Sequence, residues 1–297
     1  MIIETWADLV EGLDRALAFV RSIGLDEEAE ASRFKLFRDR LSSLAQILEG
    51  EGGNAALDCF DADRELNAVA LTESHEFLTI LPYLQSLPPE RVKAKLKIVL
   101  RGPDRPTREE KGSSEPRDTM FELNVAARLH RAGIPVEIGQ EADLQFTWGG
   151  MRWFGECKRP YQAESIETSL ERACCQLERR FASTRLAARG IIAISVSRPL
   201  NSRAPYFEYS GAKRLRASLK QHVRNMARLI KVRIQELESC RRQTGLGLLI
   251  VHLLMPGWDL AARIPTAVQY SAGADLSRDG RLDGQRLWIA IEGTFNR

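Results

Sequence analysis

The chain has 297 residues, of which 44% are hydrophobic and 28% are charged. This balance is typical of a folded globular protein and excludes a disordered or fibrous chain. The longest apolar run, Gly245 to Met255, is too short to span a bilayer, and the acidic first turn lacks the pattern of a signal peptide. Five cysteines without regular spacing and four histidines predict no zinc site and no disulfide framework. We therefore expect a cytoplasmic protein that has reduced cysteines and does not associate with membranes.

The net charge of +3 is unevenly distributed along the chain. Residues 1–117 carry a balance of −6, and the remaining residues carry +9. The basic residues are mostly arginine, with 34 Arg against nine Lys. Because the planar guanidinium group matches the oxygens of a phosphate, this bias weakly favours a nucleic-acid partner for the second half.

The first hundred residues have apolar side chains at helical spacing, for example Trp6, Leu9, Leu13 and Leu17. We expect an all-helical N-terminal domain over residues 1–101. It carries no catalytic constellation, so its expected role is packing, homodimer formation or docking of a regulatory partner. Residues 102–117 are rich in Pro, Gly, Ser and charge, which predicts an exposed linker and a domain boundary.

The pattern after the linker is that of an α/β domain, predicted over residues 118–297. A helix is followed by three short strands, of which the last two are joined by a two-residue turn at Gly149 and Gly150. The expected order is helix, three strands, helix, strand, helix, strand, which favours a mixed sheet. The predicted elements are helices 118–133, 164–190 and 213–243 and strands 134–139, 142–148, 151–158, 190–197, 245–255 and 286–293.

A candidate catalytic group lies at the end of the strand MRWFGECK. Because strand side chains alternate between two faces, Glu156 and Lys158 point to the same side, and Asp143 on the neighbouring strand can face the same way. Two carboxylates form an oxygen site of the kind that Mg²⁺ or Mn²⁺ prefers. An acid-x-Lys triplet arises about once by chance in this composition, and the second example, at Glu109, falls in the linker. The alternative for Glu156 and Lys158 is a simple ion pair at a strand end.

Two helical residues could complete this group. Glu122 shares a helical stripe with apolar residues, although a capping box with Thr119 would also explain a glutamate there. Gln176 lies one position beside the apolar stripe of the next helix, where an ordinary surface glutamine is the alternative.

Together these residues resemble the PD-(D/E)xK nuclease superfamily, which has the restriction-endonuclease-like fold. The resemblance covers about residues 119–197, where Glu122, Asp143, Glu156-Cys-Lys158 and Gln176 follow in order along an expected αβββαβ core. It implies metal ligation by Asp143 and Glu156, a catalytic role for Lys158 and an accessory acid at Glu122. Gln176 corresponds to a glutamine that some branches carry. Those branches have a tyrosine where this chain has Arg180, and the proline of the motif is replaced by Ala142.

The long helix after residue 212 is strongly basic, with a balance of +8 over residues 213–242. Its polar side could contact a phosphate backbone, a sequence-independent interaction that weakens with salt. A solvated helix face is the alternative. The candidate contact residues are Lys213, Arg216, Lys220, Arg224, Arg228 and Lys231.

The sequence therefore favours a metal-dependent nuclease that hydrolyses phosphodiester bonds. DNA is favoured over RNA only because members of the superfamily that the chain resembles commonly act on DNA. A role as a defence or mobile-element effector is expected by analogy with other nucleases that carry an additional helical domain. Two alternatives remain open: a catalytically inactive nucleic-acid-binding protein on the same scaffold, and a helical protein-interaction module.

Overall fold

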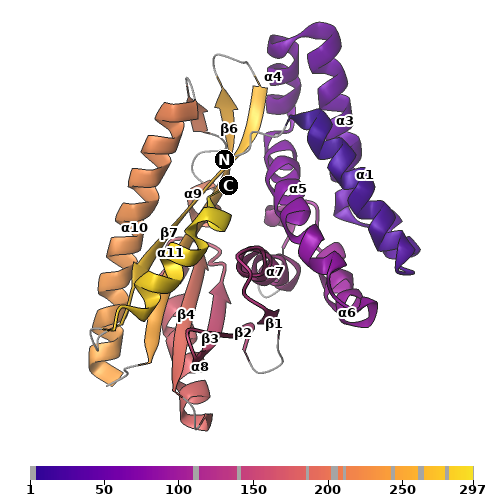
Figure 1. The fold of residues 1–297 in the computed structure, drawn as a ribbon. Helices are drawn as coiled ribbons and strands as arrows, with labels where there is room; N and C mark the ends of the chain where they lie inside the picture. Colours follow the sequence, from indigo (N-terminus) through magenta and orange to yellow (C-terminus); the bar gives the residue numbers. More distant parts are fainter. Residues whose placement is uncertain are drawn as a thin grey trace. The chain divides into compact units, whose positions relative to one another are not determined.

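A computed structural model describes residues 5–109, 114–138, 142–184, 187–201, 207–209, 212–241, 245–259, 264–277 and 281–296. The chain forms two compact units. The first comprises residues 1–120, 204–215 and 255–268, and the second comprises residues 121–203, 216–254 and 269–297. An α/β fold with a helical N-terminal region is confirmed (Figure 1). None of the described helices is both long and apolar enough to cross a membrane.

The N-terminal region consists of helices with an apolar stripe turned inward. Thr5 caps the first helix by accepting a hydrogen bond from the Asp8 amide, and Asp8 accepts one in return from the Thr5 amide. Ser32 caps a later helix by accepting a hydrogen bond from the Lys35 amide, so residues 26–51 form two helices. The helices are α1 (Trp6–Ser22), α2 (Asp26–Glu30), α3 (Arg33–Glu51), α4 (Gly53–Ala62), α5 (Arg64–Gln85) and α6 (Pro89–Leu100), followed by the 3-10 turn η1 (Pro106–Arg108).

A cluster of buried charges holds the segment after α6 against these helices. Glu73 of α5 accepts hydrogen bonds from Arg33 and from Arg117, and Arg117 also pairs with Glu109. All four side chains are almost fully buried. Within the predicted linker 102–117, Arg117 and Glu109 are therefore buried in ion pairs, whereas Thr107 and Arg108 are exposed.

A seven-stranded sheet is present in the described residues, with the order β1-β2-β3-β4-β6-β5 and with β7 paired to β6. The β1–β2 and β2–β3 pairs are antiparallel, whereas β3–β4, β4–β6 and β5–β6 are parallel, so the sheet is mixed as expected. The strands are β1 (Val136–Glu137), β2 (Leu144–Trp148), β3 (Met151–Lys158), β4 (Ala188–Ser195), β5 (Phe207–Tyr209), β6 (Leu246–Asp259) and β7 (Ile264–Asp275).

Helices α7 (Glu115–Arg131) and α8 (Ser165–Ser183) cover opposite faces of the β3–β4 region. Phe121 of α7 contacts His252, with 5.8 Å between the ring centroids, on the face that also carries Cys157. On the other face, a Cβ atom added to Gly190 would meet Phe181 and Leu177 of α8 at 2.9 and 3.0 Å. Both faces of β3 are therefore buried, as parallel sheets require.

The helices after β4 are α9 (Ser197–Asn201), α10 (Ala212–Arg241) and α11 (Asp283–Phe295). The predicted strand 286–293 was wrong, because this segment lies in α11. Its buried residues Leu287, Ile291 and Phe295 recur every four positions, which is a helical stripe. Arginines anchor both ends of the helix: Arg189 bonds to Asp283 at 3.0 Å, and Arg128 donates to the Thr294 carbonyl at 2.9 Å.

The buried charge cluster generates a prediction for stability. We expect Glu73→Ala to leave Arg33 and Arg117 without their shared carboxylate, at a cost of about 3–5 kcal/mol. Thermal unfolding should then occur about 10 °C lower than in the wild type. Glu11→Ala is the matched control, because Glu11 pairs with Arg15 at an exposed position where such pairs contribute little. Equal effects of the two substitutions would contradict this account.

Candidate functional site

Asp143, Glu156 and Lys158 meet at the open end of the β2–β3 hairpin. Leu144 pairs with Gly155, so Asp143, one residue earlier, stands opposite Glu156 on the same face of the sheet. The Lys158 Nζ atom lies 2.7 Å from Glu156 Oε2 and 3.5 Å from Asp143 Oδ2. The structure therefore brings together the three residues that the sequence pattern selected.

The turn and one backbone hydrogen bond fix this arrangement. Gly149 and Gly150 have φ values of 59° and 74°, which a two-residue hairpin turn of this kind requires and which set the register of the strands. The Cys157 amide donates a hydrogen bond to Asp143 Oδ2 at 2.7 Å. Asp143 directly precedes β2, so its carboxylate accepts the bond that a backbone carbonyl would accept within the sheet. Asp143 is thereby oriented toward its neighbours on β3.

Glu156 is much more buried than its two partners. Its side chain is 2% exposed, against 22% for Asp143 and 17% for Lys158. Burial and, next, the negative charge of Asp143 raise the pKa of Glu156 from 4.5 to about 7, although Lys158 opposes this rise. The site thus holds a carboxylate whose charge its own surroundings only partly compensate.

Lys158 has the electrostatic environment of a permanent ammonium ion. Burial by itself lowers its pKa, but the carboxylates of Asp143 and Glu156 outweigh that effect, so the pKa is raised from 10.5. The side chain is therefore positively charged at neutral pH and acts as an electrostatic group.

The donor set fits a hard divalent cation that has few protein ligands. Mg²⁺ commonly takes one or two carboxylates and completes its octahedron with waters and phosphate oxygens. Asp143 and Glu156 supply two carboxylates on neighbouring strands, and the raised pKa of Glu156 shows that added positive charge would be stabilising there. Among the described residues, no group of three or more His, Cys, Asp and Glu side chains could hold a metal.

The two helical candidates lie on α7 and α8, the helices that cover opposite faces of the β3–β4 region. Helix α7 begins four residues before Thr119, so the capping box proposed for Glu122 is not formed. Glu122 is half-buried. The pKa of the Cys157 thiol is raised first by burial, then by the negative charge of Asp143 and then by that of Glu122. Gln176 is half-buried on α8, and in the described part of the chain no hydrogen bond joins it to the three central residues.

Arg180 is a neighbour of the site that the sequence pattern did not select. It lies one helical turn after Gln176 on α8. Its positive charge acts on Glu156, where it opposes the larger pKa-raising effects of burial and Asp143. The Arg180 Nε atom is buried, and the described residues provide it with no hydrogen-bond partner. The signals in the sequence were its i, i+4 spacing from Gln176 and its place where the resembling branches have a tyrosine.

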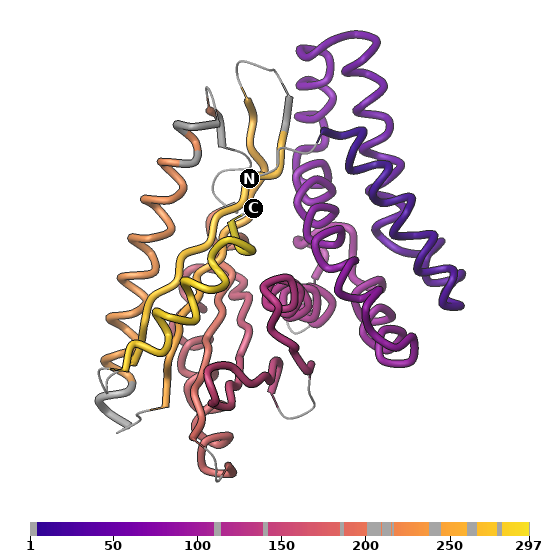
Figure 2. The backbone as a smooth tube through the Cα atoms, in the orientation of Figure 1, coloured from indigo at the N-terminus to yellow at the C-terminus, as the bar shows by residue number. Residues whose placement is uncertain are grey.

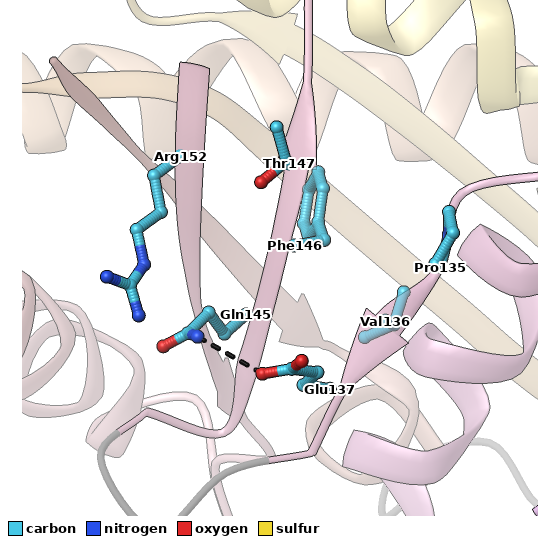
Figure 3. A pocket seen from close by; sticks show the side chains of 7 residues that line it. All are labelled: Pro135, Val136, Glu137, Gln145, Phe146, Thr147 and Arg152. Carbon is cyan, nitrogen blue, oxygen red and sulfur yellow. Dashed lines mark hydrogen bonds between the residues drawn. The ribbon is translucent and has the colours of Figure 1, made fainter. Parts of the chain in front are cut away.

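A pocket of about 250 Å³ opens beside β1, β2 and the start of β3 (Figure 3). Its polar side chains include Gln145, which donates to Glu137 at 3.3 Å, and Arg152. The strand pairings place these three residues on the same face of the sheet as Glu156. The pocket is lined by Pro135, Val136, Glu137, Gln145, Phe146, Thr147 and Arg152.

The basic helix α10 presents part of the predicted stripe to solvent. Lys220, Arg224 and Arg228 are exposed at intervals of four residues, and Lys231 is half-buried. Figure 2 shows this segment as one continuous helix. The side chains of Lys213 and Arg216 lie outside the described residues.

No protein-family model matches the chain, and no curated protein or solved structure matches it.

The buried carboxylate generates a pH prediction for the metal-free protein. Because the pKa of Glu156 is about 7 in the fold and near 4.5 when unfolded, the contribution of this group to stability is fully present below pH 4.5 and is lost as pH rises through 7. We expect Glu156→Gln to escape this loss and to be more stable than the wild type at pH 8, by at most roughly 3 kcal/mol.

Chemical denaturation at pH 5 and pH 8 in the presence of a chelator measures this effect. The difference between Glu156→Gln and the wild type should grow with pH. Glu164→Gln, which makes the same charge change at an exposed position, should show no such growth. A Glu156→Gln protein that is less stable than the wild type at pH 8 would show that the carboxylate is a favourable structural ion pair.

Proposed function

We propose that this protein is a metal-dependent phosphodiesterase that cleaves nucleic acid. The observation that carries the proposal is the placement of two carboxylates and a lysine on adjacent strands, with Lys158 Nζ 2.7 Å from Glu156 and 3.5 Å from Asp143. The second carboxylate beside Glu156 and the raised pKa of Glu156 favour a cation-binding site over a purely structural ion pair.

The residues have distinct roles in this proposal. Asp143 and Glu156 hold one or two Mg²⁺ ions, which when bound supply a nucleophilic water and stabilise charge on the phosphate. Lys158 remains an ammonium ion, orients the attacking water and offsets the charge that develops on the phosphate oxygens. Arg180 approaches the same carboxylate from α8 and adds a second cation for the substrate phosphate.

The order of the elements supports the same reading. Helix α7, strands β1, β2 and β3, helix α8 and strand β4 follow one another as αβββαβ, with antiparallel pairs followed by the parallel β3–β4 pair. This is the arrangement that the resemblance to the PD-(D/E)xK superfamily implies. This likeness of topology and motif supports the proposal.

The basic stripe of α10 provides a substrate grip that does not depend on sequence. Lys220, Arg224 and Arg228 are exposed and occupy successive turns, so their charges can follow a line of phosphates. Arg233 differs from them, because it pairs with Glu167 of α8 and with Glu236 at 2.7 Å. Its charge is already partly neutralised within the protein.

The decisive test is cleavage of supercoiled plasmid, linear duplex, single-stranded DNA and RNA with Mg²⁺, with Mn²⁺ and with a chelator. We expect cleavage only with metal, complete loss in Glu156→Ala and at least about a hundredfold loss in Lys158→Ala. Glu164→Ala should retain activity. Metal-loaded, folded wild type that cuts none of these substrates would contradict the proposal and favour a binding protein.

A second experiment tests the grip of α10. We expect the triple variant Lys220→Ala, Arg224→Ala, Arg228→Ala to weaken nucleic-acid binding to a similar extent for all sequences. It should lower the slope of log affinity against log salt by about 3. Fluorescence anisotropy over a range of salt concentrations measures this slope. Arg233→Ala is the control and should change it little; an unchanged slope in the triple variant would remove α10 from the interface.

A further inference from the structure

Tyr161 is an exposed aromatic side chain, with 51% of its surface accessible. It lies three residues after Lys158, so chain geometry limits the separation of their Cα atoms to about 11 Å. An exposed aromatic ring is thus tied closely to the proposed catalytic lysine.

Arg198 covers one side of this ring. Its guanidinium carbon lies 3.5 Å from the ring centroid, which is a stacked cation–π contact. The contact follows from the topology: β3 and β4 are parallel and pair Lys158 with Ile194, so the segments that leave their carboxyl ends emerge at the same edge of the sheet. Tyr161 follows β3 by three residues, and Arg198 follows β4 by three residues.

The local chain holds Tyr161 in place. Pro160 precedes it and is buried. The pyrrolidine ring fixes the φ angle of Pro160 itself. The next residue, Gln162, accepts a hydrogen bond from Ser165 Oγ at 2.7 Å at the start of α8. Arg198 covers one side of the ring, and 51% of the residue's surface is still accessible.

We propose that Tyr161, backed by Arg198, is a stacking platform for an unpaired base close to the scissile phosphate. Aromatic rings bind bases of single strands by stacking, and this interaction tolerates any base because every base has a π face. A paired base inside a duplex offers no free face to such a platform. The substrate class is therefore single-stranded or locally unpaired nucleic acid.

This inference rests on the proposed function for its substrate, but it can be tested without cleavage. Binding is measured on a Glu156→Gln background without divalent metal, by anisotropy of labelled single-stranded DNA, single-stranded RNA and a duplex of the same sequence. Oligonucleotides that carry 2-aminopurine at successive positions report stacking directly, because stacking on an aromatic ring quenches its fluorescence.

We expect Tyr161→Ala to weaken single-strand binding about tenfold and to abolish the quenching, with duplex binding unchanged. Tyr161→Phe should restore both signals, because the ring is retained, and Arg198→Ala should give a smaller loss. Ile289→Ala on α11 is the control, since Ile289 is exposed to a similar degree, at 67%. The DNA and RNA arms show which kind of single strand is preferred.

The outcomes separate this inference from the proposed function. Unchanged single-strand affinity in Tyr161→Ala, or equal losses for single strand and duplex, overturns the stacking platform even if the wild type cleaves with metal. Single-strand affinity that depends on Tyr161, in a protein that never cleaves, supports the platform and overturns the nuclease. Absence of any nucleic-acid binding at low salt overturns both.

Discussion

The burial of Glu156 beside Asp143 is the constraint on which the rest of the site depends. Two carboxylates share one hydrogen-bonded ammonium group, the fold keeps Glu156 2% exposed, and Lys158 and Arg180 only partly offset the effect of burial and of Asp143 on its pKa. A buried carboxylate is unfavourable unless cations compensate it. The structure therefore maintains a carboxylate that only added positive charge can fully stabilise.

The charge cluster of the first unit shows what a structural ion network looks like in the same chain. There two arginines meet two glutamates, and Glu73 uses both of its oxygens, on Arg33 and on Arg117. Cations and anions are balanced, and every member is almost inaccessible. At β3 the hydrogen-bonded group holds two carboxylates and one ammonium ion, and Asp143 and Lys158 remain partly open to solvent. This access to solvent is the clearest difference between the two charge clusters.

The sequence was sufficient to predict the site wherever local rules determine geometry. Gly149 and Gly150 define a two-residue turn, the turn fixes the register, and the register places Asp143 opposite Glu156. The α/β class followed from the same kind of local pattern.

Features that depend on tertiary packing could not be read from the sequence. The burial of Glu156 requires α8 to cover its face of β3, which no pattern within β3 reveals. Composition made residues 102–117 look like a linker, although Arg117 finds its carboxylate partner 44 positions earlier. The apolar run in α11 was compatible with a strand or a helix. The two arginines that bond to the ends of this helix, Arg128 and Arg189, are far from it in sequence.

The surroundings of the candidate site differ between the two ends of β3. Arg152, near the hairpin turn, borders the pocket with Gln145 on the face that also carries Glu156 and Lys158. At about 3.3 Å per residue, Arg152 lies roughly 13 Å from Glu156 along the strand. Beyond the opposite end of the strand, Tyr161 and Arg198 form a stacked pair. A polymeric substrate with its scissile phosphate at Glu156 would thus have a polar pocket toward one end of β3 and an aromatic surface toward the other, so only extended chains could use both.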